Sequence, residues 1–449
     1  MDYNFKKINI KQYLNDEVVD YASYTTLRQL TSIVDGLKNA SRKVINTITK
    51  TNGEVKVEIL SGTVSVDNEY LHGPSNLNDV IVNLAKDYPG TNNIPLLTRE
   101  GNFGKRFKNE ASAARYIYTE KEKVLGLIYK KEDNNILIKQ NFEGTDIEPR
   151  YYVPIIPMLL VNGSLGMATG FKQVILPRDP KKITKFLIKK LENNDLVYDI
   201  PPSFTGLKCD IVENGEHNKW EIIGKYNIKN TSTIEVVEIP PKYDLSKYRK
   251  VLDELEDNGD IVSYNDMSND DKFLFVIKMN RKTLEGMDNK SIISLLKLSQ
   301  KTSELYNSID RNNRVFMYKN VNEIMNDFYD IRLEYYSLRK EHQIETLKNE
   351  INLNISRYMF VDGVIKNLID IKNSSKEEII NIIKQIDKIE EFEGSYDYLL
   401  RMPIYSMSKE KMKELKDKVI KVKDDLIQLI NTDIKSTWKQ ELEELFKAL

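Results

Sequence analysis

The pair Arg115-Tyr116 is the part of the sequence whose residue types could most directly do chemistry. It lies in the segment ASAARYIYT, which runs from Ala111 to Thr119. A tyrosine phenol becomes a strong nucleophile when it loses its proton, which in model peptides happens at about pH 10, so it needs positive charge nearby. The adjacent arginine is always charged and can bind a phosphate through two hydrogen bonds. The chain has 25 tyrosines, and any one of them is more often a packing or surface residue, so the pair needs support from other motifs.

Four further motifs accompany this pair along the chain. They contribute basic residues, a histidine and a methionine, in the segments VDGLKNASRKV (Val34–Val44, with Lys38, Arg42 and Lys43), YLHG (Tyr70–Gly73, with His72), EGNFGKR (Glu100–Arg106, with Lys105 and Arg106) and PIIPMLLVNGSLGMATG (Pro154–Gly170, with Met167). Each motif has an ordinary interpretation: Arg42 and Lys43 fit a solvated helix face, His72 a packing or surface residue, and Met167 a buried core. The glycines of EGNFGKR are too closely spaced for a nucleotide-binding phosphate loop.

Several functional classes find no support in the sequence. It contains no Asp-x-Asp pair and no carboxylate cluster at metal-ligand spacing, so we expect no metal site in this chain. The single cysteine, Cys209, rules out an internal disulfide framework and fits a reducing cytoplasm. The apolar stretch Tyr151–Val161 is too short to cross a membrane and contains two prolines. The N-terminus lacks the basic-then-apolar layout of a secretory signal.

Charge is distributed unevenly along the chain. Of the 449 residues, 40% are hydrophobic and 30% charged, and the net charge is −1. A neutral total does not exclude a nucleic-acid partner, because a local basic groove can be balanced by acidic segments elsewhere. The segment Arg99–Lys123, which includes the Arg-Tyr pair, is locally basic.

The first zone of the chain, residues 1–145, contains the elements that must position most of these motifs. We expect a helix whose apolar stripe Leu27, Leu30, Ile33 and Val34 ends at Asp35-Gly36, and a second helix from about Ser41. A third helix starts at Ser75, a good N-cap residue. Short helices followed by β-rich segments are the ingredients of a winged helix-turn-helix domain.

The remaining chain divides into two further zones. Residues 146–318 alternate strands with helices, with a strand expected at 234–239 and a helix at 183–193. Residues 319–449 are nearly all helix. Apolar residues from Ile324 to Leu338, and again from Met412 to Leu429, follow coiled-coil spacing. The two long helices could pair as an antiparallel arm with a small helical domain at its tip, or be ordinary amphipathic helices of a bundle.

In their order and spacing, the five motifs resemble the cleavage and rejoining subunit of type IIA DNA topoisomerases. This family includes gyrase A and its counterpart in topoisomerase IV, and the resemblance is closest to the medium subunit of tailed-phage enzymes. It covers nearly the whole chain. It implies a mixed α/β, helix-rich fold with a winged-helix DNA-binding domain, an α/β tower domain, and a long antiparallel coiled coil with a helical exit-gate domain.

The resemblance also implies an activity and a set of site residues. Tyr116 would attack a DNA phosphodiester and store the bond energy as a phosphotyrosine. The implied catalytic residues are Tyr116, Arg115, Arg42 and His72, and the implied DNA-binding residues are Lys38, Lys43, Ser75, Lys105, Arg106 and Met167. Met167 matches the position at which the family uses isoleucine as a wedge that bends the DNA.

The resemblance further implies partners and cofactors. The chain would act as a homodimer on double-stranded DNA. Mg²⁺ and ATP would be bound by a separate ATPase/TOPRIM subunit, and relaxation or decatenation would result rather than active supercoiling. One departure concerns His72: bacterial members carry a second histidine two positions earlier and an aspartate after the glycine, where this chain has Tyr70 and Pro74. A proton relay built on a histidine pair therefore does not transfer.

Two other classes of protein fit the motifs less well. A winged-helix regulator that dimerises by a coiled coil would need neither the Arg-Tyr pair nor the later wedge motif. A tyrosine recombinase would carry its tyrosine late in the chain, with several arginines and histidines before it. Here the tyrosine is early and the histidines number three.

Overall fold

The computed structural model describes residues 9–215, 218–269 and 272–449. The chain forms two compact units. The first comprises Met1–Arg332 together with Lys439–Leu449, and the second comprises Leu333–Trp438. Helices and strands are mixed in the first unit, while the described part of the second unit is helical. This confirms the mixed, helix-rich fold class, and the division at residues 145 and 318 stays a prediction.

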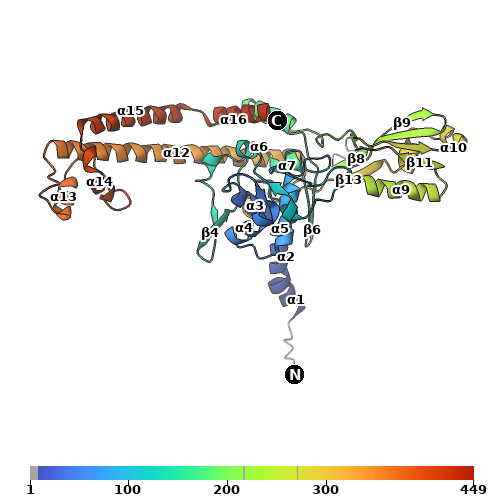
Figure 1. Cartoon of the computed structure of the whole chain (residues 1–449), viewed down its shortest axis with the longest axis horizontal. Helices are drawn as coiled ribbons and strands as arrows, with labels where there is room; N and C mark the ends of the chain where they lie inside the picture. The colour runs from blue at the N-terminus through green and yellow to red at the C-terminus, as the bar shows by residue number, and fades with distance from the viewer. Residues whose placement is uncertain (1–8, 216–217, 270–271) are drawn as a thin grey trace, which may run out of the picture. The chain divides into compact units, whose positions relative to one another are not determined.

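The N-terminal part of the first unit is a cluster of short helices (Figure 1). Its elements are α1 (Ile10–Tyr13), the π-helical turn η1 (Leu14–Val18), α2 (Val19–Gln29), α3 (Asn39–Ile48), β1 (Val55–Lys56), α4 (Val57–Asp67) and α5 (Pro74–Ala85). Helices α3, α4 and α5 share one core, built from side chains such as Val44, Ile48, Leu60, Val64 and Leu77, which are at most 1% exposed. The helix expected from about Ser41 is confirmed as α3.

Two details of the expected helices are wrong. Helix α2 ends at Gln29 because Leu30 is extended, with φ −88° and ψ 145°, so Ile33 and Val34 are buried from a turn and not from a helical stripe. Helix α5 starts at Pro74 with Gly73 as its N-cap, and no side chain caps it. Proline fits the first helical position because the N–H that it lacks would have no partner there. Ser75 is therefore not the N-cap.

A series of short elements follows and carries the later motifs. They are the 3₁₀ turn η2 (Ala114–Tyr116), β2 (Tyr118–Thr119), α6 (Lys123–Ile128), the 3₁₀ turn η3 (Lys131–Asp133), β3 (Lys139–Phe142), β4 (Thr145–Pro149), α7 (Met158–Asn162), β5 (Ser164–Ala168), β6 (Phe171–Ile175) and α8 (Pro180–Glu192). Strand β2 pairs antiparallel with β1, and β5 pairs antiparallel with β6. Helix α8 confirms the helix expected at 183–193, and the side chain of Asp179 caps its N-terminus.

The rest of the first unit contains two larger antiparallel sheets and the two-stranded sheet β14-β15. Its strands and helices are β7 (Asp210–Glu213), β8 (Lys219–Ile223), β9 (Lys225–Asn230), β10 (Thr233–Glu238), α9 (Leu245–Asp257), β11 (Ser263–Asp266), β12 (Phe275–Lys278), α10 (Arg281–Glu285), α11 (Asn289–Leu295), β13 (Ser299–Ser303), β14 (Asn307–Ile309) and β15 (Val315–Met317). One sheet has the order β11-β12-β10-β9 and the other β13-β8-β7. The strand expected at 234–239 is confirmed as β10. The four-stranded sheet packs its apolar face against α9, around Tyr248 and Phe275.

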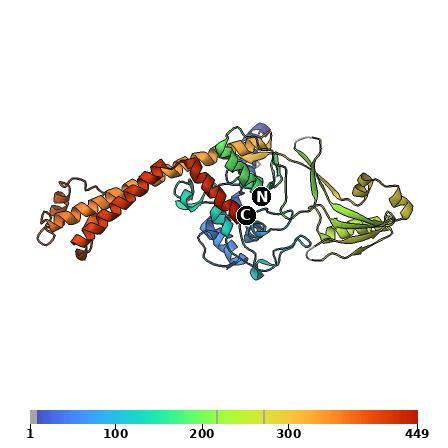
Figure 2. The same ribbon diagram turned by 90° about the horizontal axis from the view of Figure 1, so that it is seen from above.

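The second unit is dominated by two long helices that lie side by side (Figures 1 and 2). The helices of this part of the chain are α12 (Val321–Ile365), α13 (Lys376–Ile383), α14 (Asp397–Leu400), the 3₁₀ turn η4 (Ile404–Ser406), α15 (Lys409–Asn431) and α16 (Ile434–Ala448). The start of α12 and most of α16 belong to the first unit. Lys340 Nζ donates to the carbonyl of Ile430 at 2.8 Å, and Lys418 binds Glu350 at 2.9 Å. Because the contact moves toward lower numbers on α15 as it moves toward higher numbers on α12, the helices run antiparallel. In the described ranges, no helix is long and apolar enough to span a membrane.

Candidate functional site

The turn that carries Tyr116 is held firmly by backbone hydrogen bonds. Val57 N–H donates to the carbonyl of Ile117 at 3.1 Å, and Glu100 and Tyr118 exchange two bonds of 3.0 and 2.9 Å. Ile117 is 1% exposed and anchors the segment in the core. The Tyr116 side chain, next to this anchor, is 69% exposed. The backbone is therefore fixed while the phenol remains accessible to a large substrate.

Arg115 supplies positive charge to this phenol. Its guanidinium carbon lies 5.5 Å from the centre of the Tyr116 ring, within the range of a cation–π contact. Tyr118, two residues on, is 38% exposed and lies in β2, where its ring contacts Lys56. The structure thus separates the two tyrosines: one lies in a strand and the other projects from the end of a 3₁₀ turn.

Arg42 and Lys43, on α3, lie in a buried ionic layer. Arg42 is 7% exposed and forms two hydrogen bonds to the carboxylate of Asp35, of 2.6 and 3.2 Å. Burial alone would lower the pKa of Arg42, but the charge of Asp35 and the hydrogen bonds to it outweigh this effect, so the pKa is raised. Lys43, also 7% exposed, lies 2.9 Å from the carboxylate of Glu148.

This burial rules out the solvated helix face for Arg42 and Lys43. It also differs from a pair of free phosphate contacts, since each cation already has a carboxylate partner. Asp35 is fixed in turn by the backbone N–H groups of Leu37 at 3.0 Å and Tyr152 at 3.2 Å. The catalytic role of Arg42 and the DNA contact of Lys43 stay predictions.

His72 belongs to a cluster of aromatic and charged side chains. The hydroxyl of Tyr24, on α2, lies 2.6 Å from Nε2 of His72. The Tyr70 ring meets the imidazole edge-on, with centres 5.4 Å apart. Burial, followed by the positive charge of Arg28, lowers the pKa of His72 below its ordinary value, so the ring is neutral near pH 7. Burial raises the pKa of Tyr70, and Arg28 acts in the opposite direction.

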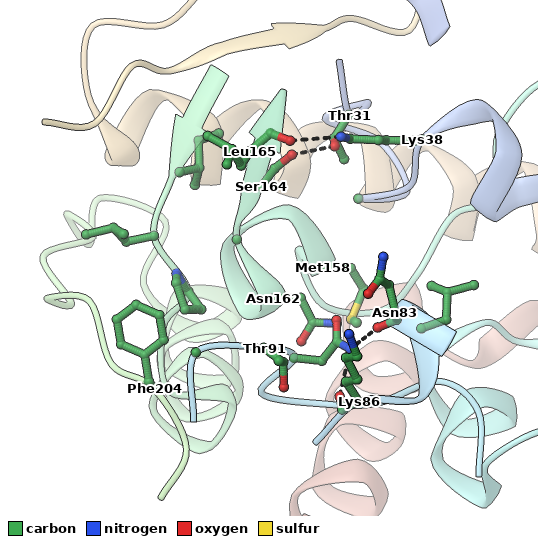
Figure 3. A pocket seen from close by; sticks show the side chains of 18 of the residues that line it. Thr31, Lys38, Asn83, Lys86, Thr91, Met158, Asn162, Ser164, Leu165 and Phe204 are labelled. Atoms are coloured by element: carbon green, nitrogen blue, oxygen red, sulfur yellow. Dashed lines mark hydrogen bonds between the residues drawn. The ribbon is translucent and has the colours of Figure 1, made fainter. Parts of the chain in front are cut away.

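Lys38 lines a pocket of about 730 Å³ between α5, β5 and the loop after β6. Its ammonium group donates to the carbonyl of Leu165 at 2.8 Å. Figure 3 shows this bond, with Asn83 and Lys86 further along the same pocket. Burial lowers the pKa of both Lys38 and Lys86. Three lysines, Lys38, Lys86 and Lys242, line this pocket and give it a positive character.

Met167 lies on the β5–β6 hairpin and is 67% exposed. The interpretation as a buried core methionine is therefore wrong. The hairpin is bonded to the end of α2 through Thr31, whose hydroxyl lies 2.6 Å from that of Ser164 and whose N–H donates to Gln173 at 2.9 Å. An unbranched apolar side chain thus projects from a supported hairpin.

The remaining predicted residues have different surroundings. Ser75 is exposed in the first turn of α5. Lys105 is exposed, and its backbone exchanges hydrogen bonds with that of Lys108. Arg106 is 7% exposed, and its guanidinium donates to backbone carbonyls that include those of Ile239, at 2.8 Å, and Tyr243. This differs from the expected phosphate contact, because carbonyl oxygens already hold the cation.

Sequence reasoning missed four residues that the structure places in these clusters. Tyr24 and Arg28 surround His72, and Asp35 and Glu148 hold Arg42 and Lys43. Asp35 lies seven residues before Arg42, so a local acidic partner could have been suspected. Glu148 gave no such signal, since 105 residues separate it from Lys43. In the described residues, no group of three or more His, Cys, Asp or Glu side chains is placed to hold a metal ion.

Comparisons with known proteins agree on one family. A profile of the A subunits of DNA gyrase and topoisomerase IV matches residues 28–443. The mitochondrial DNA topoisomerase 2 of Dictyostelium discoideum is 31% identical over 100% of this chain and 36% of its own length. DNA topoisomerase 2 of Plasmodium falciparum is 30% identical over 100% of this chain and 35% of its own length. The chain thus spans about a third of these relatives.

A solved structure extends the similarity to the fold. The crystal structure of the Plasmodium falciparum topoisomerase II DNA-binding, cleavage and re-ligation domain matches with a TM-score of 0.87 and 29% identity. The match covers 100% of this chain and 65% of that one.

Proposed function

The chain belongs to the family of DNA gyrase and topoisomerase IV A subunits, and on that premise we propose that it cleaves and rejoins double-stranded DNA through a covalent bond to Tyr116. The observation that carries the proposal is the exposed phenol on a fixed turn beside Arg115, within the matched residues. Family membership favours this activity over a winged-helix regulator or a tyrosine recombinase.

The proposed reaction is a reversible transesterification. The Tyr116 oxygen attacks phosphorus, gives up its proton, and becomes joined to the 5′-phosphate. The bond from phosphorus to the 3′-oxygen breaks, and that oxygen takes up a proton as a hydroxyl. Arg115 stabilises the charge on the phosphate oxygens, and His72 donates a hydrogen bond to them. Since one phosphoester replaces another, the 3′-hydroxyl can reverse the step.

The DNA-bending part of the proposal rests on Met167. An exposed apolar side chain on a supported hairpin can insert between base pairs and kink a duplex. Lys38, in its positive pocket, and the exposed Lys105 and Ser75 are the proposed contacts to the DNA backbone. In this proposal α3, α4 and α5 form the winged-helix domain, and the sheets around α9 form the tower.

We propose that the chain acts as a homodimer, so that two copies of Tyr116 cut opposite strands. The antiparallel helices α12 and α15 would form the coiled-coil arm. Near its tip, Ile404 and Tyr405 are 83% and 84% exposed, a pair of adjacent apolar residues that fits a symmetric exit-gate contact. The likeness to the phage medium subunit stays a prediction.

Magnesium and ATP belong to a second subunit in this proposal. The described residues of this chain offer no fitting carboxylate cluster, so we propose that an ATPase/TOPRIM subunit binds both. Relaxation or decatenation of DNA would be the result of the assembled complex. The purified chain should then bind DNA but form almost no covalent complex with added Mg²⁺ alone.

Mapping the covalent adduct tests the proposal directly. The chain, assembled with its ATPase/TOPRIM subunit, is denatured during reaction with labelled duplex DNA, and the modified peptide is identified by mass spectrometry. We expect the adduct on Tyr116, its loss in Tyr116→Phe, and its retention in the control Tyr118→Phe. An adduct that persists in Tyr116→Phe would show the assignment to be wrong.

A further inference from the structure

The contact between Tyr24 and His72 joins two segments that are 48 residues apart in sequence. Its length of 2.6 Å is short for a hydrogen bond between a hydroxyl and a ring nitrogen. Both side chains are reachable from solvent, with Tyr24 49% exposed. A surface tyrosine would ordinarily be free to rotate, so a bond of this length at the surface calls for an explanation.

Helix α2, which carries Tyr24, is itself held in place. The next residue, Thr25, has its hydroxyl 3.1 Å from that of Thr169, at the tip of the β5–β6 hairpin. Thr31, two residues past the end of the helix, is bonded to Ser164 and Gln173 of the same hairpin. Tyr24 therefore projects from a fixed support and not from a loose N-terminal helix.

The protonation states of the two rings define which atom donates. Arg28 and partial burial favour the neutral imidazole, which has one acceptor nitrogen and one N–H donor. A phenol is protonated at neutral pH and is a good donor. With the Tyr24 hydroxyl donating to Nε2, the proton of the imidazole must lie on Nδ1. In the part of the chain that the structure describes, Nδ1 of His72 has no hydrogen-bond partner.

We propose that Tyr24 is a positioning residue for the cleavage reaction: its hydroxyl binds Nε2 of His72, fixes the Nδ1–H tautomer, and leaves that N–H free to bind a phosphate oxygen of the DNA. The inference rests on the proposed function, which places His72 beside the cleaved phosphate. The histidine then acts as an oriented donor and needs no second histidine. Tyr24 thus does for His72 what a second histidine could do in members that carry a histidine at the position of Tyr70.

Among the described residues, few side chains face His72, so a change in its tautomer or pKa can be assigned to one of them. Tyr24 and Arg28 face it from α2, and Tyr70 faces it from the segment before α5. The chain has three histidines, so ring nitrogens labelled with ¹⁵N give few signals. A His72→Gln variant identifies the signal of His72.

The first measurement uses the purified chain alone, without DNA or a partner. Ring ¹⁵N shifts and a pH titration are recorded for the parent, Tyr24→Phe and Tyr21→Phe. Tyr21 is on the same helix and 65% exposed, which makes it the matched control. We expect the Nδ1–H tautomer in the parent and in the control. In Tyr24→Phe we expect a shift toward Nε2–H and a higher pKa of His72, because the donor to the neutral ring is lost. Unchanged ring shifts in Tyr24→Phe would overturn the proposal.

The second measurement follows the rate of covalent adduct formation against pH, in the complex assembled with the ATPase/TOPRIM subunit. We expect Tyr24→Phe to be slower by about 10-fold, a fraction of what a positioned proton-transfer or donor group contributes. The acidic limb of its rate profile should move by the same interval as the pKa of His72. A changed tautomer with a parental rate would overturn the positioning role.

The two proposals fail in different ways. If the parent forms no adduct, or if Tyr116→Phe still forms one, the proposed function is wrong, while the ring shifts still report on the Tyr24–His72 bond. If the adduct depends on Tyr116 but Tyr24→Phe leaves ring shifts and rate unchanged, the positioning role alone is wrong.

Discussion

The turn η2 and the helix α3 present similar basic residues in opposite surroundings. On η2, Arg115 lies beside the exposed Tyr116. On α3, Arg42 and Lys43 are each only 7% exposed and lie against Asp35 and Glu148. Arg115 has no part in the core and is accessible from solvent, whereas Arg42 is paired with a nearby carboxylate and Lys43 connects α3 to Glu148, 105 residues away. A basic motif in this chain can therefore serve either chemistry or the fold, depending on whether a carboxylate is buried next to it.

The largest expected effect is on the free energy of unfolding, when the buried ion pair of Arg42 and Asp35 is broken. Asp35→Ala leaves the Arg42 guanidinium without its carboxylate, and removal of one partner of a buried pair costs about 3–5 kcal/mol. Denaturant unfolding, followed by a signal from the first unit, measures this loss. The matched control is Asp87→Ala, since Asp87 pairs with Arg99 at the surface and exposed pairs contribute about 1 kcal/mol or less. Equal losses of unfolding free energy in the two variants would show that the buried pair contributes no more to stability than the surface pair.

Arg115→Gln should have the opposite effect: almost no loss of stability and a large loss of cleavage rate. The free energy of unfolding should change by no more than about 0.5 kcal/mol, as for other exposed substitutions. The rate of adduct formation in the assembled complex should fall by about 100-fold, the usual effect of losing one preformed donor at a developing negative charge. Parallel unfolding and cleavage measurements check both numbers. If Arg115→Gln is destabilised but cleaves at the parental rate, Arg115 stabilises the structure and has no role in cleavage.

Met167→Ala should weaken DNA bending without affecting the fold. The wedge drives unstacking that costs about a few kcal/mol per step, so the bent state becomes less populated, while the salt dependence of binding stays constant because no charge is removed. Energy transfer between dyes at the ends of a duplex measures the bend. Met317→Ala is the control, because Met317 is 69% exposed on β15. A parental bend in Met167→Ala would contradict the wedge.

The smallest effect at neutral pH concerns Cys209, whose thiol is partly buried while the phenol of Tyr116 is exposed. Burial, and then the charge of Glu238, raises the pKa of the Cys209 thiol to about 12. The native protein therefore holds little thiolate at pH 9, and alkylation by iodoacetamide should be on the order of 1000-fold slower than in urea, where the pKa returns to about 8.5.

The same shift makes the stability of the protein depend on pH above the ordinary thiol range. The folded pKa lies above the unfolded value of about 8.5, so the contribution to stability is complete below that value and is lost as pH rises toward the folded pKa. Cys209→Ser should remove this part of the pH dependence. Equal alkylation rates in the native and unfolded protein would contradict the raised pKa of the Cys209 thiol.

The parts of the structure that follow local rules were predicted, and those that depend on distant partners were not. Helix α8 and strand β10 follow directly from apolar spacing. The end of α2 did not, because Leu30 turns into an extended conformation where its neighbours bond to the β5–β6 hairpin more than 130 residues away. Arg106 was expected at the surface for the same reason: the carbonyl oxygens that hold it lie on residues 239 and 243.

The candidate site shows the same division. Tyr116, Arg115 and Met167 lie in exposed positions, which fits the roles that the resemblance implies for them. Asp35, the partner of Arg42, lies in the same motif, but Glu148 and Tyr24, the partners of Lys43 and His72, could not be read from the motifs, because a pairing between distant segments depends on how the chain folds back on itself.

The contact between Gly166 and α2 defines how far Met167 reaches from the protein. A Cβ atom on Gly166 would lie 2.7 Å from the carbonyl oxygen of Gln29, so the hairpin rests on main-chain atoms. This contact limits how closely the hairpin can approach α2. Substitutions elsewhere on the hairpin leave this backbone contact in place. A side chain at position 166 would clash with the carbonyl oxygen of Gln29 and push the hairpin away from α2. In the proposed wedge, the backbone would therefore set the depth of insertion into DNA, and the side chain at position 167 would set the shape of the inserted tip.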